Sequence, residues 1–425
     1  MTATESPAPV MVASEGSDDG GRHRVVVVVL ALVVVGAGLL SVALLGNELR
    51  YPDERDYLRL THHLVEDGRF AIHTRPTASR PPGYPFLLAP FVALGVGTAP
   101  LRLVNFACLA GAAYAAFRLV RLVAPGNYAY AAAGGVVVYP FSLYTAGTFY
   151  PQVPSALALI AGVFFLYRGV EQGRRGLLSV GAGGLLLGVS VLMVPNHAFI
   201  VLIAAVWAAV VSDAGRRLVV VAVLLLGAAV LPATWTVRNL VQFDEVVLIS
   251  TNGGLNLLLG NSEDAGANSG VNVDIERYEA EGRRLDEFER DRYYRDAAID
   301  WVQDNPGAAA TLYLRKVVNY FNFRNDLYVD EEASPLKDFV GAVSYLPLLA
   351  ILAARLALVR RFPLTRLEGL IVALYLSNAL FLAAFFTRVR FRLPLDLLLI
   401  AGLCVFAARA VPEWRRRRAS GAVIA

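Results

Sequence analysis

Three carboxylate side chains, Asp53, Glu54 and Asp56, lie a few residues beyond the first hydrophobic segment of the chain. Carboxylates at the edge of a bilayer are costly to desolvate, so their presence there points to a function. Pro52 suits the first turn of a helix, and the acidic residues suit its positive N-terminal end. The sequence therefore predicts a short helix that begins with these carboxylates.

One face of this predicted helix is apolar. At helical spacing, Asp53, Tyr57, Leu60 and Leu64 share a face that ends near Gly68. We expect this face to lie on the membrane-embedded bundle, with Asp53 at its head.

Asp53 in that position could act as a general base. Asp56 lies three residues on, and two neighbouring carboxylates raise each other's proton affinity, to which partial burial adds. A carboxylate of this kind can take the proton of a hydroxyl group. The alternative is a helix-initiating carboxylate in a solvated loop, and spacing alone favours neither interpretation.

Three arginines near the C-terminus, Arg388, Arg390 and Arg392, stand at every second position. In an extended link they would point the same way. Each would cost about 2.5–3.5 kcal/mol at mid-bilayer, so we expect them at the membrane edge or facing a polar cavity. Guanidinium groups bind phosphate oxygens in pairs and would stabilise a phosphate leaving group. The alternative is that they reach lipid headgroups.

The composition predicts a membrane protein of many spans rather than a soluble enzyme. Of the 425 residues, 56% are hydrophobic and 17% are charged, and the mean hydropathy is +0.52. The net charge of +4 comes mainly from basic clusters at span ends, which indicates membrane orientation and not nucleic-acid binding.

The fold class predicted is an all-α polytopic bundle of about ten transmembrane helices, each needing about 20 apolar residues. The segment 83–99 is short and contains two prolines, and we expect it to lie along the interface, because the basic clusters then fall on one side. This interpretation places both termini in the cytoplasm. The predicted spans are 25–45, 101–121, 128–148, 154–170, 177–193, 197–212, 218–236, 338–356, 367–385 and 393–410.

The chain is divided accordingly into a membrane domain, residues 23–412, between a disordered N-terminal tail, 1–22, and a basic tail, 413–425. The domain includes a first extracytoplasmic loop, 47–100, and a large loop, 237–337. Within the large loop, Leu285 to Gln303 has the pattern of an amphipathic helix that ends at Asn305.

No metal or cofactor is predicted. Cys108 and Cys404 both lie in apolar segments and imply neither a disulfide nor a thiolate site. His62 and His63 are adjacent, so on a helix they point about 100° apart and make poor joint ligands. We interpret them, with His73, as interface histidines.

Three stretches in order resemble the GT-C membrane glycosyltransferases, and most closely the protein O-mannosyltransferases and the aminoarabinose transferases of lipid A. The first is Asp53-Glu54-x-x-Tyr57 with Gly68, followed by Arg80-Pro81-Pro82-Gly83-Tyr84-Pro85. The second is Trp235-x-x-Arg238-Asn239, followed by the segment from Ser250 to Asn261. The third is Arg390-Phe391-Arg392-Leu393-Pro394. The likeness covers residues 25–410.

The resemblance implies an inverting transferase that takes a sugar from a polyprenyl-phosphate carrier. It implies Asp53 as the catalytic base and Glu54 as a supporting acid. The acceptor would be a lipid, a polysaccharide or a protein, reached at the extracytoplasmic side of a bacterial cytoplasmic membrane. Departures from the family at Gln152 and at Val194-Pro195 bear on donor or acceptor recognition.

Substrate-binding residues are predicted within the same stretches. Arg238 could meet the phosphate or act as an interfacial anchor beside Trp235. Asn256 and Asn261 could bind sugar, although shaping of the loop is the favoured interpretation. The full set of predicted substrate-binding residues is Tyr57, Arg80, Tyr84, Arg238, Asn256, Asn261, Arg388, Arg390 and Arg392.

Two other function classes fit a polytopic chain. A transporter or lipid flippase would place charged or broken-helix sites near the bilayer midplane, whereas the predicted spans carry no charge near their middles. A scaffold without catalysis is the second alternative. The distribution of charge favours surface chemistry.

Overall fold

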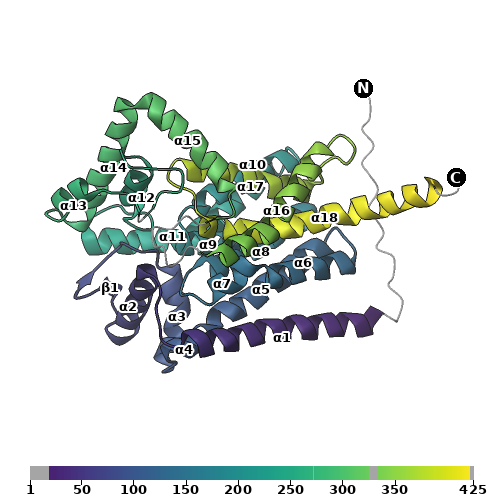
Figure 1. Cartoon of the computed structure of the whole chain (residues 1–425), viewed down its shortest axis with the longest axis horizontal. Helices are drawn as coiled ribbons and strands as arrows, with labels where there is room; N and C mark the ends of the chain where they lie inside the picture. The colour runs from purple at the N-terminus through teal and green to yellow at the C-terminus, as the bar shows by residue number, and fades with distance from the viewer. Residues whose placement is uncertain (1–18, 271, 325–333, 422–425) are drawn as a thin grey trace.

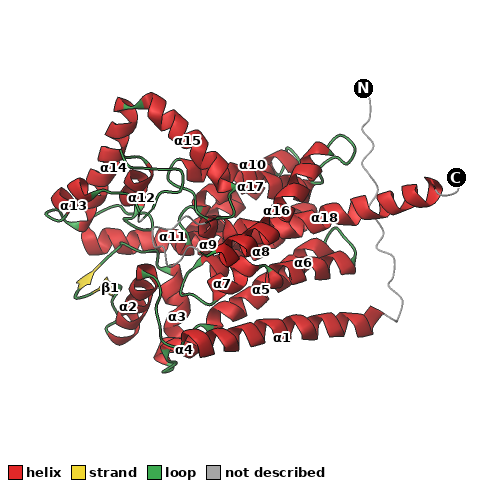
Figure 2. Cartoon of the chain, in the orientation of Figure 1, coloured by secondary structure: helices red, strands yellow, loops and turns green. Residues whose placement is uncertain are grey.

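Helices form most of the protein, as the apolar periodicity of the sequence predicts. The computed structural model describes residues 19–270, 272–324 and 334–421, and it is 76% helical (Figures 1 and 2). The strands of the described residues form one hairpin, β1 (Ala71–Ile72) and β2 (Arg75–Pro76), which pair antiparallel with Ala71 opposite Pro76. The all-α polytopic fold class is confirmed.

Within the described part of the chain, eight helices are long and apolar enough to cross a membrane. They correspond to eight of the predicted spans, and the first of them is almost uncovered by the rest of the protein. They are α1 (Asp19–Leu45), α5 (Leu103–Arg121, preceded by α4, Thr98–Leu101), α8 (Gln152–Glu171), α9 (Leu177–Met193, preceded by the short η1, Gly173–Gly176), α11 (Arg217–Phe243), α16 (Pro335–Ala357), α17 (Arg366–Ala383) and α18 (Val389–Gly421).

The other two predicted spans differ from a full-length helix. The segment 128–148 was predicted as continuous, and this was wrong, because it breaks into α6 (Gly126–Val138) and α7 (Pro140–Ala146). Pro140 has no N–H to donate and forces Tyr139 into an extended conformation with ψ 116°. The second is α10 (His197–Val211), an apolar helix of 15 residues. The interfacial candidate α3 (Gly83–Ala93) spans only about 16 Å, too short to cross alone.

Arg390 and Arg392 lie on a helix and Arg388 directly precedes it, so the expectation of an extended link that carries all three was wrong. Helix α18 begins at Val389 and continues through the predicted tail to Gly421. Successive residues on a helix are about 100° apart, so the side chains of Arg390 and Arg392 are about 200° apart and cannot point in the same direction. The predicted row of three parallel guanidinium groups therefore does not form.

A polar lobe packs on one end of the bundle. It consists of α12 (Gly253–Gly260), α13 (Glu276–Gly282), α14 (Glu287–Asp304) and α15 (Pro306–Tyr320), and it lies beside α2 (Pro52–Glu66), away from the start of α1 and the end of α18 (Figure 1). The helix predicted over 285–303 is confirmed as α14. Asp286 caps its first turn, and Asn305 follows its last residue.

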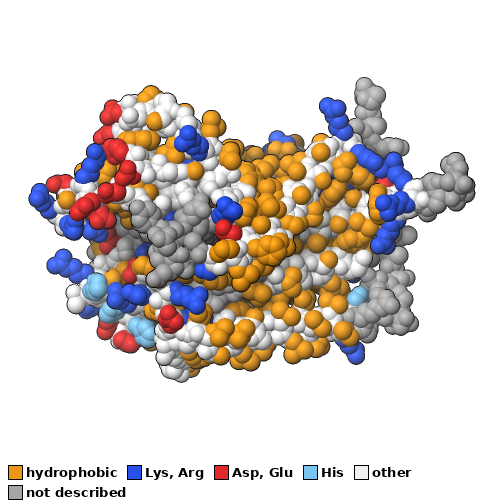
Figure 3. Space-filling view, in the orientation of Figure 1, with side chains coloured by type: hydrophobic (Ala, Val, Ile, Leu, Met, Phe, Trp, Pro, Cys, Tyr) orange, Lys and Arg blue, Asp and Glu red, His pale blue; other side chains and the backbone are white. Residues whose placement is uncertain are grey.

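The surface follows this division. Hydrophobic side chains cover the middle of the molecule, acidic and basic side chains cover the polar lobe, and basic side chains gather at the end near the C-terminus (Figure 3). The helix α1 faces outward with an apolar surface that includes Val25, Leu32 and Leu44. Such a band suits lipid contact. Of the predicted tail 1–22, residues 1–18 lie outside the described part.

Close backbone contact between α9 and α11 depends on glycine. A Cβ added at Gly184 would lie 2.3 Å from the Leu224 carbonyl oxygen, whereas one added at Gly181 would lie 3.5 Å from a Val223 methyl group. Small residues at helix contacts are the usual means of tight packing between membrane helices.

We therefore expect Gly184→Ala to push α9 and α11 apart and to destabilise the protein by about 1–3 kcal/mol. Thermal unfolding of the purified protein in detergent measures the effect. Gly181→Ala, on the same helix, is the matched control and should unfold like the wild type. Equal unfolding temperatures for both variants would contradict the packing argument.

Candidate active site

The first turn of α2 carries Asp53, as predicted. Pro52 occupies the first helical position, and the helix buries Tyr57, Leu58 and Leu60 on the side that faces the bundle. The side chain of Asp53 remains 22% exposed. The sequence therefore places this carboxylate at the boundary between the bundle and the surface.

Two arginines from distant parts of the chain bind Asp53. Its Oδ1 lies 2.8 Å from Nη2 of Arg80, and its Oδ2 accepts a hydrogen bond of 3.0 Å from Nη1 of Arg390. Arg80 also donates to Oδ2 of Asp56, at 2.8 Å. The structure thus brings together the acidic helix, the Arg-Pro-Pro segment and the start of the last helix.

The pKa of Asp53 is lowered, and the expectation that Asp56 and burial would raise it was wrong. Burial by itself raises the pKa, but the charges of Arg390 and then Arg80 outweigh it, with hydrogen bonds from both. Asp56 does not reverse the effect, since its own carboxylate is bound to Arg80.

Tyrosine rings line the base of this cluster. Tyr57 is buried, and burial raises its pKa to about 12. Its ring meets that of Tyr84 edge to face at 5.4 Å, and the Tyr84 hydroxyl donates to Asn105. The guanidinium of Arg390 lies 4.8 Å from the ring centre of Tyr150. Tyr57 and Tyr150 adjoin the charged groups, whereas Tyr84 is fully buried behind them.

Glu54 faces the interior, away from Asp53. Its Oε2 accepts hydrogen bonds from the backbone N–H groups of Arg50 and Tyr51, at 2.7 and 3.0 Å. Its Oε1 accepts one of 2.8 Å from the N–H of Phe149. With 1% exposure, this carboxylate joins the start of α2 to the loop after α7. These contacts favour a structural role over the supporting acid that the resemblance implies.

The three late arginines diverge. Arg388 donates to the carbonyl of Ser269 and to Oδ1 of Asn272, and burial, followed by the charge of Arg390, lowers its pKa to about 10. Arg392 is buried and binds Asp396 in the next turn, with further bonds to carbonyl groups. Arg390 alone of the three contacts Asp53.

The buried pair of Arg392 and Asp396 was missed in the sequence. The hydroxyl groups of Tyr139 and Tyr375 donate to the Asp396 carboxylate at 3.1 and 3.0 Å. The spacing of the pair, four residues, is that of helical ion pairs, which is the signal that could have found it. Because its partners are all internal, Arg392 is better explained as part of the bundle's packing than as a phosphate ligand.

The second resembling stretch also holds the fold together. Arg238 donates to the carbonyl groups of Thr77 and Phe70, and its guanidinium lies 4.7 Å from the ring centre of Trp235. Asn261 donates to the carbonyl groups of Leu257 and Ala384. Asn256 is half-buried beside them on α12. These placements agree with the anchoring and loop-shaping alternatives.

Glu287, at the start of α14, holds the segment that carries Arg80. Its Oε2 accepts a hydrogen bond of 2.6 Å from the hydroxyl of Thr77, and its Oε1 accepts one of 2.9 Å from the N–H of Ala78 and one of 2.7 Å from Thr251. In the sequence it was indistinguishable from any acidic residue in a first helical turn.

Lys316, on α15, holds the link before α18. Its buried Nζ donates to the carbonyl groups of Gly260 and Phe385, at 3.0 and 2.8 Å, and burial lowers its pKa to about 8. Asn319, one turn further, donates to both the carbonyl and the hydroxyl of Thr387. The polar lobe thus positions Arg80 from one side and Arg388 with Arg390 from the other.

The histidines lie apart from the cluster. His62 pairs with Glu66, and His63 with Asp67, along the exposed face of α2. Within residues 19–270, 272–324 and 334–421, no three His, Cys, Asp or Glu side chains are grouped closely enough to hold a metal ion.

Comparison with known proteins identifies the fold. Residues 79–238, less than half of the chain, match the family described as dolichyl-phosphate-mannose-protein mannosyltransferase. No curated protein matches the sequence.

Three solved structures are similar at 15% identity. One is the oligosaccharyltransferase AglB from Archaeoglobus fulgidus in complex with an inhibitory peptide and a dolichol-phosphate, with a TM-score of 0.59 over 96% of this chain and 52% of that chain. The apo form of the Archaeoglobus fulgidus oligosaccharyltransferase gives 0.55, over 96% and 53%. ArnT from Cupriavidus metallidurans bound to undecaprenyl phosphate gives 0.48, over 94% and 63%.

The chain spans about half the length of the archaeal relatives, so the likeness concerns only part of each of those chains. It agrees with the family match over 79–238 and with the three resembling stretches in the sequence. The chain therefore has the fold of the GT-C superfamily of membrane glycosyltransferases.

Proposed function

We propose that this protein is an inverting glycosyltransferase, which moves a monosaccharide from a polyprenyl-phosphate donor to an acceptor hydroxyl at the extracytoplasmic face of the membrane. The observation that carries the proposal is the position of Asp53 between Arg80 and Arg390, at 2.8 and 3.0 Å. This arrangement unites a base for the acceptor with cations for the leaving phosphate in one partly exposed site.

The step would form one bond and break another. The acceptor oxygen attacks the anomeric carbon as Asp53 takes its proton, and the bond from that carbon to the phosphate oxygen breaks. The phosphate leaves with the bonding electrons, and Arg390 and Arg80 stabilise the negative charge that develops on it. Attack opposite the leaving group inverts the anomeric configuration.

Donor binding would also activate the base. In the free protein the two arginines keep Asp53 ionised but weakly basic. A donor phosphate bound to the same guanidinium groups would compete for their charge and place a negative charge beside the carboxylate. Both effects raise the pKa of Asp53, so its basicity increases when the donor is present.

The excess of positive charge supports a phosphate ligand. Asp53 and Asp56 balance Arg80 and Arg390, whereas the partners of Arg388 in the described part of the chain are neutral. AglB, which shares this fold, was solved with a dolichol-phosphate. By that likeness we assign the donor to the class of lipid-linked sugars.

Asp53→Asn should strongly reduce turnover, because the amide cannot take up the proton of the acceptor hydroxyl. We expect a loss of about 10²–10⁴-fold in the release of free carrier phosphate from a polyprenyl-phosphate sugar, measured in proteoliposomes. Glu66→Gln, on the exposed end of the same helix, is the control and should retain activity. Equal turnover by Asp53→Asn would remove this residue from the mechanism, and lipid transport by both proteins without turnover would favour a flippase.

Glu54→Gln should separate structure from chemistry within the acidic pair. The two carboxylate oxygens of Glu54 accept hydrogen bonds from three backbone N–H groups, whereas the glutamine amide has only one acceptor oxygen. At least one buried hydrogen bond is therefore lost, which should lower the free energy of unfolding by about 1–3 kcal/mol. We expect a lower unfolding temperature but a smaller loss of turnover per folded molecule than in Asp53→Asn. The reverse pattern would place Glu54 in the reaction.

The pH dependence of turnover should reflect the contacts of Asp53 with its two arginines. Because the pKa of Asp53 is lowered, the base form persists until the pH falls through that value, so kcat/KM for the donor should not lose this base between pH 8 and 5. Arg390→Gln removes the larger lowering charge and leaves burial to raise the pKa. Each unit of that rise costs about tenfold in base form on the acid side.

The measurement compares kcat/KM at pH 5 and pH 7.5. The value at pH 5 divided by the value at pH 7.5 should be lower in Arg390→Gln than in the wild type. It should be unchanged in Arg366→Gln, which replaces an exposed arginine that pairs with Glu171. An acid limb that is identical in all three proteins would contradict the assignment of Asp53.

A further inference from the structure

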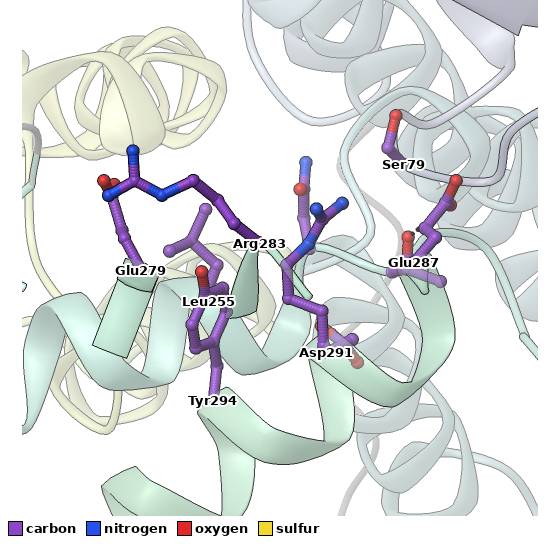
Figure 4. A pocket seen from close by; sticks show the side chains of 10 residues that line it. Ser79, Leu255, Glu279, Arg283, Glu287, Asp291 and Tyr294 are labelled. Carbon is purple, nitrogen blue, oxygen red and sulfur yellow. Dashed lines mark hydrogen bonds between the residues drawn. The ribbon is translucent and has the colours of Figure 1, made fainter. Parts of the chain in front are cut away.

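We propose that a cavity in the polar lobe is an acceptor subsite that binds a neutral saccharide, which makes the acceptor a glycan. The inference rests on the proposed function and names the substrate class of the same site. The cavity has a volume of about 290 Å³ (Figure 4). It is lined by Ser79, Thr251, Asn252, Leu255, Glu279, Arg283, Glu287, Arg290, Asp291 and Tyr294.

The cavity adjoins the catalytic cluster through the backbone. Ser79 lines it, and the next residue, Arg80, binds Asp53. Consecutive Cα atoms are about 3.8 Å apart, so the backbone of the segment that carries Arg80 borders the cavity. Figure 4 shows Ser79 and Glu287 on one side of the cavity, with Glu279 and Arg283 on the other.

Several polar side chains of the cavity are available to a ligand. Within the described part of the chain, Ser79, Asn252, Arg283 and Arg290 have no hydrogen bond or ion pair from their side chains. Asp291 uses one carboxylate oxygen for the N–H of Gly254. A hydroxyl, an amide, two guanidinium groups and a carboxylate oxygen are thus free, and sugar hydroxyl groups both donate to and accept from such groups.

The charge and size of the cavity favour a neutral saccharide. Its two guanidinium groups face three carboxylates, so it lacks the positive excess that would select a phosphate or another anion. Leu255 and Tyr294 add a small apolar wall, which suits the C–H face of a sugar ring. The volume of about 290 Å³ lies just below the range of about 300–1,000 Å³ for small-molecule sites, which suits a single sugar residue.

The subsite also shares a residue with the support of Arg80. Glu287 lines the cavity and accepts the hydrogen bonds of Thr77 and Ala78. A glycan held in the cavity would therefore contact the segment that aligns Arg80 with Asp53. One sugar residue would occupy the cavity, and a hydroxyl of its neighbour in the glycan would reach the base.

Transfer assays with purified full-length protein in lipid nanodiscs test the assignment. The donor is a polyprenyl-phosphate sugar that the wild type turns over, and the acceptors are three panels: neutral oligosaccharides of hexoses and pentoses, Ser/Thr-containing peptides, and diacylglycerol. We expect transfer to an oligosaccharide. The double variant Asn252→Ala/Arg290→Ala should raise KM for that acceptor at least tenfold and change KM for the donor less than twofold.

The matched control is Arg315→Ala, an exposed arginine of the same lobe that lies outside the cavity and should behave as the wild type. Ser79→Ala is a second variant that should raise acceptor KM if the double variant folds poorly. Transfer only to peptides or to diacylglycerol, or unchanged acceptor KM in folded variants, would overturn the subsite. Turnover that survives Asp53→Asn would instead overturn the proposed function.

Discussion

The ion pairs of Asp53 with Arg80 and Arg390 are the contacts on which the rest of the site depends. They join the first helix after α1 to the start of the last helix, across 337 positions of sequence. Charges at a half-buried edge are tolerated only when they are compensated. Each of the three groups therefore holds the others in place, and the bundle must close with the start of α2 and the start of α18 on the same face.

The polar lobe turns this junction into a rigid site. Glu287 binds the segment before Arg80, and Lys316 binds the link before Arg390, so both arginines are fixed by residues that do not touch Asp53. Half-buried Glu287 and buried Lys316 serve this purpose without a direct ion pair, since hydroxyl and N–H groups bind the first and carbonyl groups bind the second. Precise placement of that kind is what a phosphate site needs, because electrostatic stabilisation depends on preorganised donors.

The sequence predicted the positions of helices better than the directions of their side chains. Apolar length located the membrane helices, Pro52 with its acidic first turn located α2, and apolar periodicity located α14, because these depend on local chemistry. The orientation of side chains depends on the exact start of a helix. Since α18 begins at Val389, Arg390 and Arg392 face different neighbours, and the predicted row of parallel arginine side chains does not form. Likewise, the pKa of Asp53 was predicted with the wrong sign because its carboxylate neighbour was visible in the sequence and its two arginines were not adjacent to it.

The acidic pair of the first loop illustrates why a motif does not assign a role to each of its members. Successive helical residues diverge by about 100°, so Asp53 and Glu54 cannot enter the same environment. The Asp53 carboxylate is 22% exposed and faces two guanidinium groups, whereas the Glu54 carboxylate accepts hydrogen bonds from three backbone N–H groups. A helix that starts at a membrane edge requires both contacts at once. Its first N–H groups and the preceding turn need an internal acceptor, while the proposed base must stay within reach of a substrate. Adjacent acids at the first turn supply the two functions from one short segment.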